Sequence, residues 1–356
     1  MIPFSPSLQT KIDELKGKLD PVKIGAIEFS SPLLLAPMAG ICTPPFRLLM
    51  QDLGAGGTVS ELISCHGINH GNKRTLDMLK IHPQEKRVGI QLFGEDPQSM
   101  ADSIPVVMEN EPNFIDINMG CPVRKVVTKG GGSALLKDPK ALGELFSQMK
   151  KVMNVPLSIK IRMGWDAEGI NADEICHVAH EEGIEWVAIH GRTRAQQYTG
   201  TANWEYIESL VDQSKLPLIG NGDLHQAHQV RERLEKTKCA GLMIARGALR
   251  SPFIFLESAT DKASPFNGSD FFEVIKRLYD YCDEVYSEGR IKLVQMRKLI
   301  VWFAAGFPGA ASFRNMMFSC NDLEGSMRLA EDFYLSLGER KKHIDYGKAF
   351  MNSGHG

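Results

Sequence analysis

Residues 114–122 read Phe114-Ile115-Asp116-Ile117-Asn118-Met119-Gly120-Cys121-Pro122, and Lys129-Gly130-Gly131-Gly132-Ser133 follows shortly afterwards. An apolar, β-branched run that ends in Asn, Gly and a Cys-Pro step predicts a buried strand that breaks into a loop. Pro122 disfavours the helical conformation for the residue before it, so the Cys121 thiol is expected on an extended or turn backbone. The three glycines let the backbone come close to a ligand. Taken alone, the stretch is also compatible with an unreactive buried cysteine.

Short apolar segments of the same kind recur along the chain and predict eight strands. They are Leu33–Pro37, Gly57–Ser60, Val88–Leu92, Phe114–Asn118, Leu157–Ile161, Trp186–His190, Leu216–Asn221 and Ala240–Ile244. Helical patterns lie between them, several opening with a capping Asp, Asn or Pro, at Phe46–Leu53, Gln98–Asn110, Pro139–Val152, Asn171–Glu182, Trp204–Asp212 and His225–Lys236. Eight strand-and-helix units over roughly 230 residues predict an α/β fold, a parallel (β/α)₈ TIM barrel, rather than an open sheet.

The pattern changes on both sides of the expected barrel. Residues 1–21 are predicted to form an N-terminal extension, and Val22–Phe29 a hairpin arm that leads into the first barrel strand. The barrel is predicted to span residues 22–262. After a Pro-, Asn- and Gly-containing boundary at 263–269, residues 270–350 read as a helical domain, with helices at Phe271–Glu288, Arg290–Phe303 and Leu323–Leu337 and a break at 306–309.

Composition, net charge and cysteine content limit the classes of protein to which this chain can belong. The chain has 356 residues, 43% of them hydrophobic, and a net charge of −2, so a nucleic-acid partner would have to be bound by local patches and not by the overall field. Seven Cys without a C-x-x-C pair suit free thiols in a reducing compartment, and no metal-ligand set is evident. No signal peptide is recognisable, and no apolar run approaches the ~18 residues of a membrane span. We therefore expect a soluble cytoplasmic protein.

Polar residues stand at nearly all of the predicted strand ends. In a parallel barrel these ends meet at one face, where active sites form. The residues are Met38, Ser60-Glu61, Gln91, Asn118 with Cys121, Lys160 with Arg162, His190 with Arg192, Asn221 with Asp223, and Arg246. Small-residue turns at Gly220–Asp223 and Ala245–Gly247 fall where this fold commonly holds phosphate. No P-loop or dinucleotide fingerprint occurs. A flat anionic ring with a phosphate, as in FMN, fits this set, with Lys160 near the electron-rich pole of the ring. Pyridoxal phosphate is the alternative, but it leaves the loop thiol unexplained.

The same residues resemble a known family. The sequence strings are Ala36-Pro37-Met38-Ala39-Gly40, Pro45-Phe46-Arg47, Asp116 to Pro122, Gly132-Ser133-Ala134-Leu135-Leu136, Lys160-Ile161-Arg162-Met163-Gly164-Trp165, Ile189-His190-Gly191-Arg192-Thr193-Arg194, Asn221-Gly222-Asp223 and Met243-Ile244-Ala245-Arg246. Together they closely resemble the tRNA-dihydrouridine synthases, and among these the bacterial B-type branch. The similarity runs in order through residues 22–260 and is fainter in the helical tail.

The resemblance implies an enzyme that reduces the C5–C6 double bond of a D-loop uridine in tRNA, with FMN as cofactor and NADPH, or NADH, as electron donor. It implies Cys121 as the proton donor to C5, with Asn118 and Arg192 as substrate contacts. It also implies an FMN site, formed by Pro37, Met38, Gln91, Lys160, His190, Asn221, Gly222, Asp223, Ala245 and Arg246. A thiol with an ordinary pKa near ~8.5 is mostly protonated at neutral pH and can act as a general acid. A tRNA partner implies that the target nucleotide is turned out into the barrel mouth. A single enzyme acting on one tRNA is expected to be a monomer.

Several expectations concern RNA contact. The loop at 192–198, the pair Arg124-Lys125 and the helical tail could contact tRNA. In the tail, Lys292, Arg297 and Lys298 could form a basic stripe, but the segment is nearly charge-balanced, and this composition favours plain helical packing. The glycines at 130–132 predict a Cys121 loop that is mobile until RNA binds.

Two features depart from the family pattern: the residue at position 245, and the glycine run at 130–132, which is more flexible than the family loop usually is. Ala245 stands where the family usually has Gly, so its methyl group could crowd the phosphate turn unless Gly247 compensates. Two other functions stay open: an FMN barrel acting on a free pyrimidine, similar to dihydroorotate dehydrogenase, and a flavin-bearing RNA-binding protein without catalysis.

Overall fold

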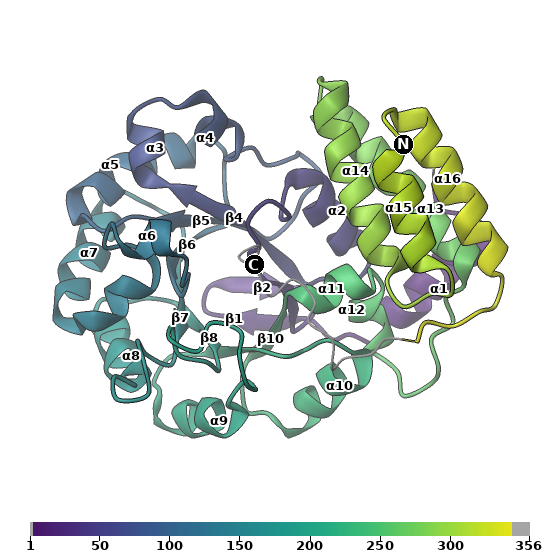
Figure 1. Cartoon of the computed structure of the whole chain (residues 1–356). Coiled ribbons are helices and arrows are strands. Elements are labelled where there is room, and N and C mark those ends of the chain that lie inside the picture. The colour runs from purple at the N-terminus through teal and green to yellow at the C-terminus, as the bar shows by residue number, and fades with distance from the viewer. Residues whose placement is uncertain (1–2, 344–356) are drawn as a thin grey trace.

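A computed structural model describes residues 3–343 and shows a closed barrel of eight parallel strands, in the order β10-β3-β4-β5-β6-β7-β8-β9 (Figure 1). The strands are β3 (Leu33–Leu35), β4 (Gly57–Ser64), β5 (Val88–Phe93), β6 (Phe114–Met119), β7 (Leu157–Arg162), β8 (Trp186–His190), β9 (Leu218–Asn221) and β10 (Gly241–Ile244). The TIM barrel predicted from the strand rhythm is therefore confirmed. Strand β4 is longer than predicted, because a register shift between Val59 and Leu62 lets it continue beyond Ser60 along β5.

Six helices surround the barrel where they were predicted. They are α2 (Pro44–Asp52), α5 (Pro97–Met108), α7 (Pro139–Lys151), α8 (Ala172–Glu181), α9 (Trp204–Gln213) and α10 (Ala227–Lys236). The side chains of Asp96, Asp138 and Asn203 accept hydrogen bonds from the first turns of α5, α7 and α9, which explains where these helices begin. Short helical segments that the sequence did not predict fill several loops: α3 (Cys65–Asn69), α4 (Lys73–Asp77), α6 (Arg124–Val127), the 3₁₀ turn η1 (Gly132–Lys137), α11 (Arg246–Arg250) and α12 (Ile254–Glu257).

The predicted hairpin arm closes the N-terminal end of the barrel. Strands β1 (Val22–Ile24) and β2 (Ile27–Phe29) pair with each other in an antiparallel sheet. Phe29 at the end of the hairpin packs edge-on against Phe114 and Trp186, with ring centroids 6.1 and 5.9 Å away. All three rings are almost fully buried. This aromatic floor fills the lower end of the barrel, so that a ligand can enter only from the C-terminal ends of the strands.

A helical region follows the barrel and lies beside it (Figure 1). It consists of α13 (Gly268–Val285), α14 (Gly289–Ala304), α15 (Ala310–Ser319) and α16 (Leu323–Leu337). Helix α15 was not predicted. It begins directly after the break at 306–309, where Gly309 has a φ of 80° that favours glycine. The predicted helical domain extends to residue 350, and its part from 344 onward lies outside the described residues.

The barrel and the helical region share one hydrophobic core. A single cluster of buried side chains includes Phe46 of α2, Phe271 of α13 and Leu8 of α1 (Pro6–Lys16). Helix α1 is also tied to α13 by an ion pair between Lys11 Nζ and Asp270 Oδ2 at 2.7 Å. The boundary expected at 263–269 is thus a change in secondary structure along the chain, and the packing continues across it.

The three cations of the suggested basic stripe on α14 all have partners within the chain. Lys292 pairs with Asp283, and Arg297 Nη1 donates to the carbonyl of Cys320 at 2.7 Å. Lys298 donates to the carbonyl of Gly40, in the loop after β3, and so joins the helical region to the barrel mouth. The plain packing interpretation of these residues therefore fits better than a stripe that faces RNA.

Between residues 3 and 343, no helix is both long and apolar enough to span a bilayer. Over the same range, no group of three or more His, Cys, Asp or Glu side chains could hold a metal ion.

Candidate active site

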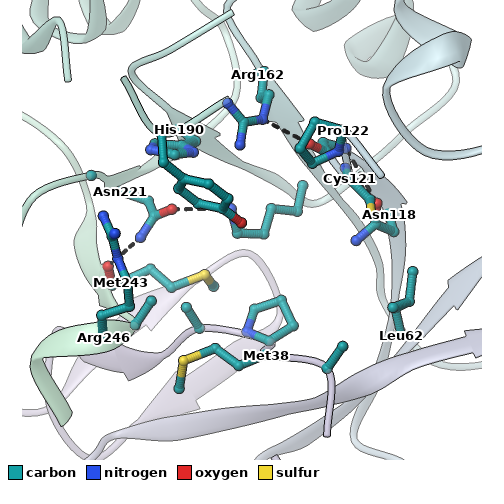
Figure 2. A pocket seen from close by; sticks show the side chains of 18 of the residues that line it. Met38, Leu62, Asn118, Cys121, Pro122, Arg162, His190, Asn221, Met243 and Arg246 are labelled. Carbon is teal, nitrogen blue, oxygen red and sulfur yellow. Dashed lines mark hydrogen bonds between the residues drawn. The ribbon is translucent and has the colours of Figure 1, made fainter. Parts of the chain in front are cut away.

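A cavity opens at the C-terminal ends of the barrel strands and collects almost all of the predicted site residues. Twelve of the thirteen line it, namely Pro37, Met38, Gln91, Asn118, Cys121, Lys160, His190, Asn221, Gly222, Asp223, Ala245 and Arg246. Figure 2 shows Asn118, Cys121 and Pro122 on one side of the cavity and His190, Asn221 and Arg246 on the other. The exception among the predicted residues is Arg192.

The Cys121 thiol stands on a loop that is held by hydrogen bonds. Asn118 Oδ1 accepts from the Cys121 N–H at 2.9 Å, and the Cys121 carbonyl accepts from the Ser133 N–H at 3.1 Å and from its hydroxyl at 2.9 Å. Gly132 has a φ of 59°, and a Cβ there would lie 2.9 Å from the Cys121 carbonyl oxygen. The glycine run therefore allows close packing of this loop, whereas its mobility before RNA binds stays a prediction.

Burial is the main electrostatic influence on the thiol. It raises the pKa of Cys121 above its ordinary value, and a backbone hydrogen bond at Val123 and the charge of Arg162 oppose this only in part. The side chain is half-buried and stays a neutral thiol at physiological pH. A protonated thiol is suited to give a proton and not to attack as a thiolate.

Lys160 and His190 form the opposite wall with Asn221. Lys160 Nζ donates to Asn221 Oδ1 at 3.1 Å, and Asn221 Nδ2 donates to the Met243 carbonyl at 2.7 Å, so the amide is fixed between them. Burial and the nearby Arg162 lower the pKa of Lys160 to about 8, so its ammonium group is still charged at neutral pH. Burial and the cations around it hold the pKa of His190 well below its usual range. This wall therefore presents one positive charge and one neutral imidazole.

Arg192 does not line the cavity, and its side chain is bound within the chain. Its side chain is only 2% exposed, and its guanidinium donates to both oxygens of Asp223, at 2.9 and 2.8 Å. Further bonds run to the carbonyls of Thr199 and Gly200, at 3.0 and 2.6 Å. Every nitrogen of the guanidinium makes a hydrogen bond within the chain, and these bonds brace the loop at 192–200 against the end of β9. A contact between Arg192 and substrate stays a prediction.

Asp223 is the acidic centre of the end of the cavity where the sequence predicts a phosphate. Although burial opposes it, hydrogen bonds from His225, Arg192 and the Ala202 N–H hold the pKa of Asp223 far below its usual range. Arg246 Nη2 lies 3.7 Å from Asp223 Oδ1. His225 Nδ1 is buried and has no hydrogen-bond partner among residues 3–343. The two side chains could serve a phosphate, Arg246 by charge and His225 by the nitrogen that lacks a partner.

The turns at this end are tightly packed and require glycine. Gly222 has a φ of 134°, and a Cβ there would lie 2.5 Å from the Ala202 Cβ. Ala245 lines the cavity. A Cβ on Gly247 would meet the Leu224 carbonyl oxygen at 2.4 Å, so packing requires glycine at this position. That Gly247 compensates for the methyl group of Ala245 stays a prediction.

Two further residues line the cavity: Arg162, which was named among the polar strand ends but given no role, and Tyr198 of the loop at 192–198. Arg162 lines the cavity and is held by hydrogen bonds from Nε to the Gly120 carbonyl and from Nη1 to the carbonyls of Thr193 and Gln197, at 2.8, 2.9 and 2.8 Å. Tyr198 also lines it, with the guanidinium carbons of Arg162 and Arg246 at 5.6 and 5.1 Å from its ring centroid. Arg162 follows Lys160 by two positions in a strand and so shares its face, a signal that was available in the sequence. The position of Tyr198 depends on loop geometry alone.

Comparison with known proteins agrees with this site. A family model described as dihydrouridine synthase matches residues 34–337. A probable tRNA-dihydrouridine synthase of Rickettsia typhi is 32% identical over 328 residues, which cover 90% of this chain and 100% of the relative. The tRNA-dihydrouridine synthase B of Pseudomonas syringae pv. tomato is 35% identical over 318 residues, covering 88% of this chain and 94% of the relative.

Solved structures are similar in fold. Histamine dehydrogenase from Rhizobium sp. 4-9 superposes with a TM-score of 0.53 at 12% identity, over 75% of this chain and 51% of that one. An amine oxidase from Pseudomonas geniculata N1, which acts on 6-hydroxypseudooxynicotine, gives 0.52 at 12% identity, over 70% and 50%. The chain thus spans about half the length of these two proteins. The resemblance seen in the sequence motifs, including the B-type branch, is confirmed by the match to the family model and by these relatives, and the chain belongs to the dihydrouridine synthase family.

Proposed function

We propose that the protein is a tRNA-dihydrouridine synthase that reduces the C5–C6 double bond of a D-loop uridine, with FMN as its flavin and NADPH, or NADH, as electron donor. Membership of the family makes the chain a flavin-dependent oxidoreductase. The tRNA substrate is inferred from the names of relatives that align over their whole length, such as the one from Rickettsia typhi. The electron donor rests on the resemblance alone.

The observation that supports the proposal most strongly is the division of the cavity into two walls. A protonated thiol and an amide, Cys121 and Asn118, stand on one wall. A neutral imidazole and an arginine, His190 and Arg246, stand on the other (Figure 2). The Lys160 ammonium group donates to Asn221 and so belongs to the same wall. A flat ring that carries a phosphate fits the second wall, and a pyrimidine that must receive a proton fits against the first.

Each wall of the cavity has a defined role in the proposed reaction. A bound, reduced FMN would supply a hydride to C6, which is both electrons and one of the two hydrogens that the C5–C6 bond takes up. Lys160 lies where its charge would stabilise negative charge on the flavin ring, and Arg246 with His225 would hold the phosphate. Pro37, Met38, Gln91, Asn221, Gly222, Asp223 and Ala245 complete this side of the cavity. On the other side, the Cys121 thiol gives its proton to C5 of the uracil, which is general-acid catalysis.

The uracil ring would be held by the residues around the thiol. Asn118 has an amide suited to the polar edge of the base, and Tyr198 with Arg162 offers an aromatic face and a planar cation at the mouth. Reduction of one base inside a folded tRNA requires that the nucleotide leave its stack. We propose that the exposed pair Arg124-Lys125 and the helical region that begins at 270 bind the RNA around this nucleotide.

Two other functions are less well supported. An FMN barrel that acts on a free pyrimidine, similar to dihydroorotate dehydrogenase, is not favoured by a family match that extends through the helices to residue 337. A flavin-bearing RNA-binding protein without catalysis would not need a protonated thiol in the cavity. Our proposal includes action as a monomer in the cytoplasm, where tRNA is modified.

The test is the dihydrouridine content of an unmodified tRNA transcript after incubation with the protein, FMN and NADPH, measured by mass spectrometry. We expect a gain of about two mass units on one D-loop uridine, and little or no gain with Cys121→Ala. A buried thiol elsewhere gives the matched control, because Cys176→Ala removes a cysteine on α8, remote from the cavity. An unchanged tRNA together with flavin reoxidised by free pyrimidines would overturn the proposal.

A further inference from the structure

Asp116 lies one layer below the cavity, in the middle of β6, and is not part of the cavity lining. Its side chain is almost fully buried, with 3% of the residue exposed. One carboxylate oxygen accepts a hydrogen bond from Gln91 Nε2 at 2.7 Å, and the other accepts from Ser158 Oγ at 2.7 Å. A buried carboxylate is costly for a fold, so this one requires a reason.

The carboxylate dictates the orientation of the amides above it. An ionised carboxylate can only accept hydrogen bonds, so Gln91 must turn its NH₂ group downward and its oxygen toward Asn118. Asn118 Nδ2 donates to that oxygen at 2.7 Å. Asn118 must then direct its own oxygen at the backbone of the thiol loop, where it accepts from the N–H groups of Cys121 and Gly120 at 2.9 and 3.3 Å. Three consecutive contacts thus have a direction that is set by one charge.

The orientation of the Gln91 and Asn118 amides decides whether N–H donors or oxygen acceptors face a ligand in the cavity. Each amide nitrogen carries two N–H groups, and the network uses one in Gln91 and one in Asn118. The second N–H of each stays available to carbonyl oxygens, which both a flavin ring and a uracil carry. If the amides were reversed, their oxygens would take these positions and repel carbonyl oxygens. In addition, the N–H of Cys121 would face an NH₂ group and lose its acceptor.

The buried carboxylate of Asp116 lowers the stability of the folded protein. Burial raises the pKa of Asp116 to about 6, although Gln91, Ser158 and the charge of Lys160 act in the opposite direction. Because the folded pKa lies above the ordinary value of about 3.9, the ionised side chain destabilises the folded protein as the pH rises through 6. A residue retained against such a cost is typical of a functional site.

We propose that Asp116 is a positioning residue: it fixes the amide orientation of Gln91 and, through it, of Asn118 and the Cys121 loop, so that the cavity presents N–H donors to the carbonyl oxygens of the flavin and the uracil. The inference rests on the proposed function, because it takes its two ligands from there. Asp116 itself touches neither ligand and acts through Gln91.

The experiment compares the FMN affinity of wild type and of variants in this network. Affinity is measured by the quenching of flavin fluorescence when FMN is titrated with the apoprotein. Asp116→Asn keeps the shape but has one acceptor and one donor, so Gln91 can bind in either orientation. We expect a dissociation constant about tenfold higher at pH 7.5. Ser158→Ala removes the other hydrogen bond to the carboxylate and should change the FMN dissociation constant by less than about twofold. In a Gln91→Met background, Asp116→Asn should have no further effect, since the amide through which it acts is gone.

A pH profile separates positioning from a structural role. The ratio of the dissociation constants of Asp116→Asn and wild type should fall toward one as the pH is lowered to about 5, because wild-type Asp116 then becomes protonated and loses its fixed polarity. Lys160 and Arg162 of β7 stay charged over this range, and His190 of β8 is the same in both proteins, so it cancels in the ratio. The FMN phosphate, His225 and Asp223 are present in both proteins and cancel in the ratio. The apoprotein of Asp116→Asn should melt at pH 7.5 no lower than wild type.

A ratio that is independent of pH, or a full effect of Asp116→Asn in the Gln91→Met background, would overturn the inference. So would a lower melting temperature that alone accounts for the lost affinity. A wild-type protein that binds no FMN and leaves tRNA unreduced would contradict the proposed function instead, so the two failures are distinguishable.

Discussion

Replacement of Arg192 by Met tests whether this arginine braces the fold or binds substrate. The variant keeps most of the aliphatic stem and removes the guanidinium. Asp223 then loses its bidentate partner, while the carbonyls of Thr199 and Gly200 lose a donor. Removing one partner of a fully buried ion pair costs about 3–5 kcal/mol. The Asp223 side chain is 27% exposed and keeps Arg246 and His225 nearby, at 3.7 and 3.6 Å, so we expect the low end, about 3 kcal/mol.

This free energy converts into a measurable melting shift. An unfolding entropy of about 2.1 cal/mol/K per residue gives roughly 0.75 kcal/mol/K for a chain of this length, so about 3 kcal/mol corresponds to roughly 4 °C. Differential scanning calorimetry of the apoprotein measures the shift without any ligand. Arg194→Met is the matched control: it removes an arginine from the same loop whose guanidinium rests on Trp165, 4.3 Å from the ring centroid, without breaking an ion pair. We expect it to melt within about 1 °C of wild type.

The contrary result is equally clear. If Arg192→Met melts like wild type and binds FMN normally, but its KM for tRNA rises while kcat is unchanged, then Arg192 contacts the substrate. The packing argument for this residue would then be wrong.

Three further perturbations follow from the structure. Cys121→Ser should slow single-turnover reduction of tRNA by about a hundredfold or more, while flavin reduction by NADPH is unchanged. In wild type, the rate of tRNA reduction should stay constant through neutral pH and fall only under alkaline conditions, because burial raises the pKa of the thiol. Lys160→Met should make the bound flavin harder to reduce, as seen by potentiometric titration, and in wild type the stabilising charge should disappear as the pH rises through about 8. Glu85→Gln should lower the free energy of unfolding by about 3 kcal/mol in urea titrations, because Glu85 is the fully buried partner of Arg47, at 2.6 Å; a loss below about 1 kcal/mol would contradict this.

The barrel was predictable because its signals are local and repeated. Each strand is a short β-branched run that ends in a polar or small residue, and a regular alternation of such runs with helices has few folds available to it. The short helices α3 and α4 were missed because five-residue segments are too short for a hydrophobic period to show. Helix α15 was hidden by the Gly- and Pro-containing break directly before it.

The site was predictable in its membership but not in its contacts. The strand ends bring the right side chains to one face, and twelve of thirteen line the cavity. Arg192 shows the limit of this reasoning. Its partner Asp223 is 31 residues away, and nothing in the local sequence tells whether the guanidinium faces the cavity or the neighbouring loop. Tyr198 was missed for the same reason, since the path of a loop determines which of its side chains reaches the mouth.

The continuous core beneath the barrel and the helices, together with the link from Lys298 to Gly40, leaves the enzyme without a hinge between its two parts. We expect a protein built in this way to change its shape little around a large ligand, so that the distortion that brings a base into the cavity occurs in the RNA. Unstacking a nucleotide costs a few kcal/mol, and less where its neighbours are already loose. Which uridine is chosen would then depend partly on how easily the RNA deforms at that point. Small-angle scattering that shows a more compact protein component on addition of tRNA would contradict this view.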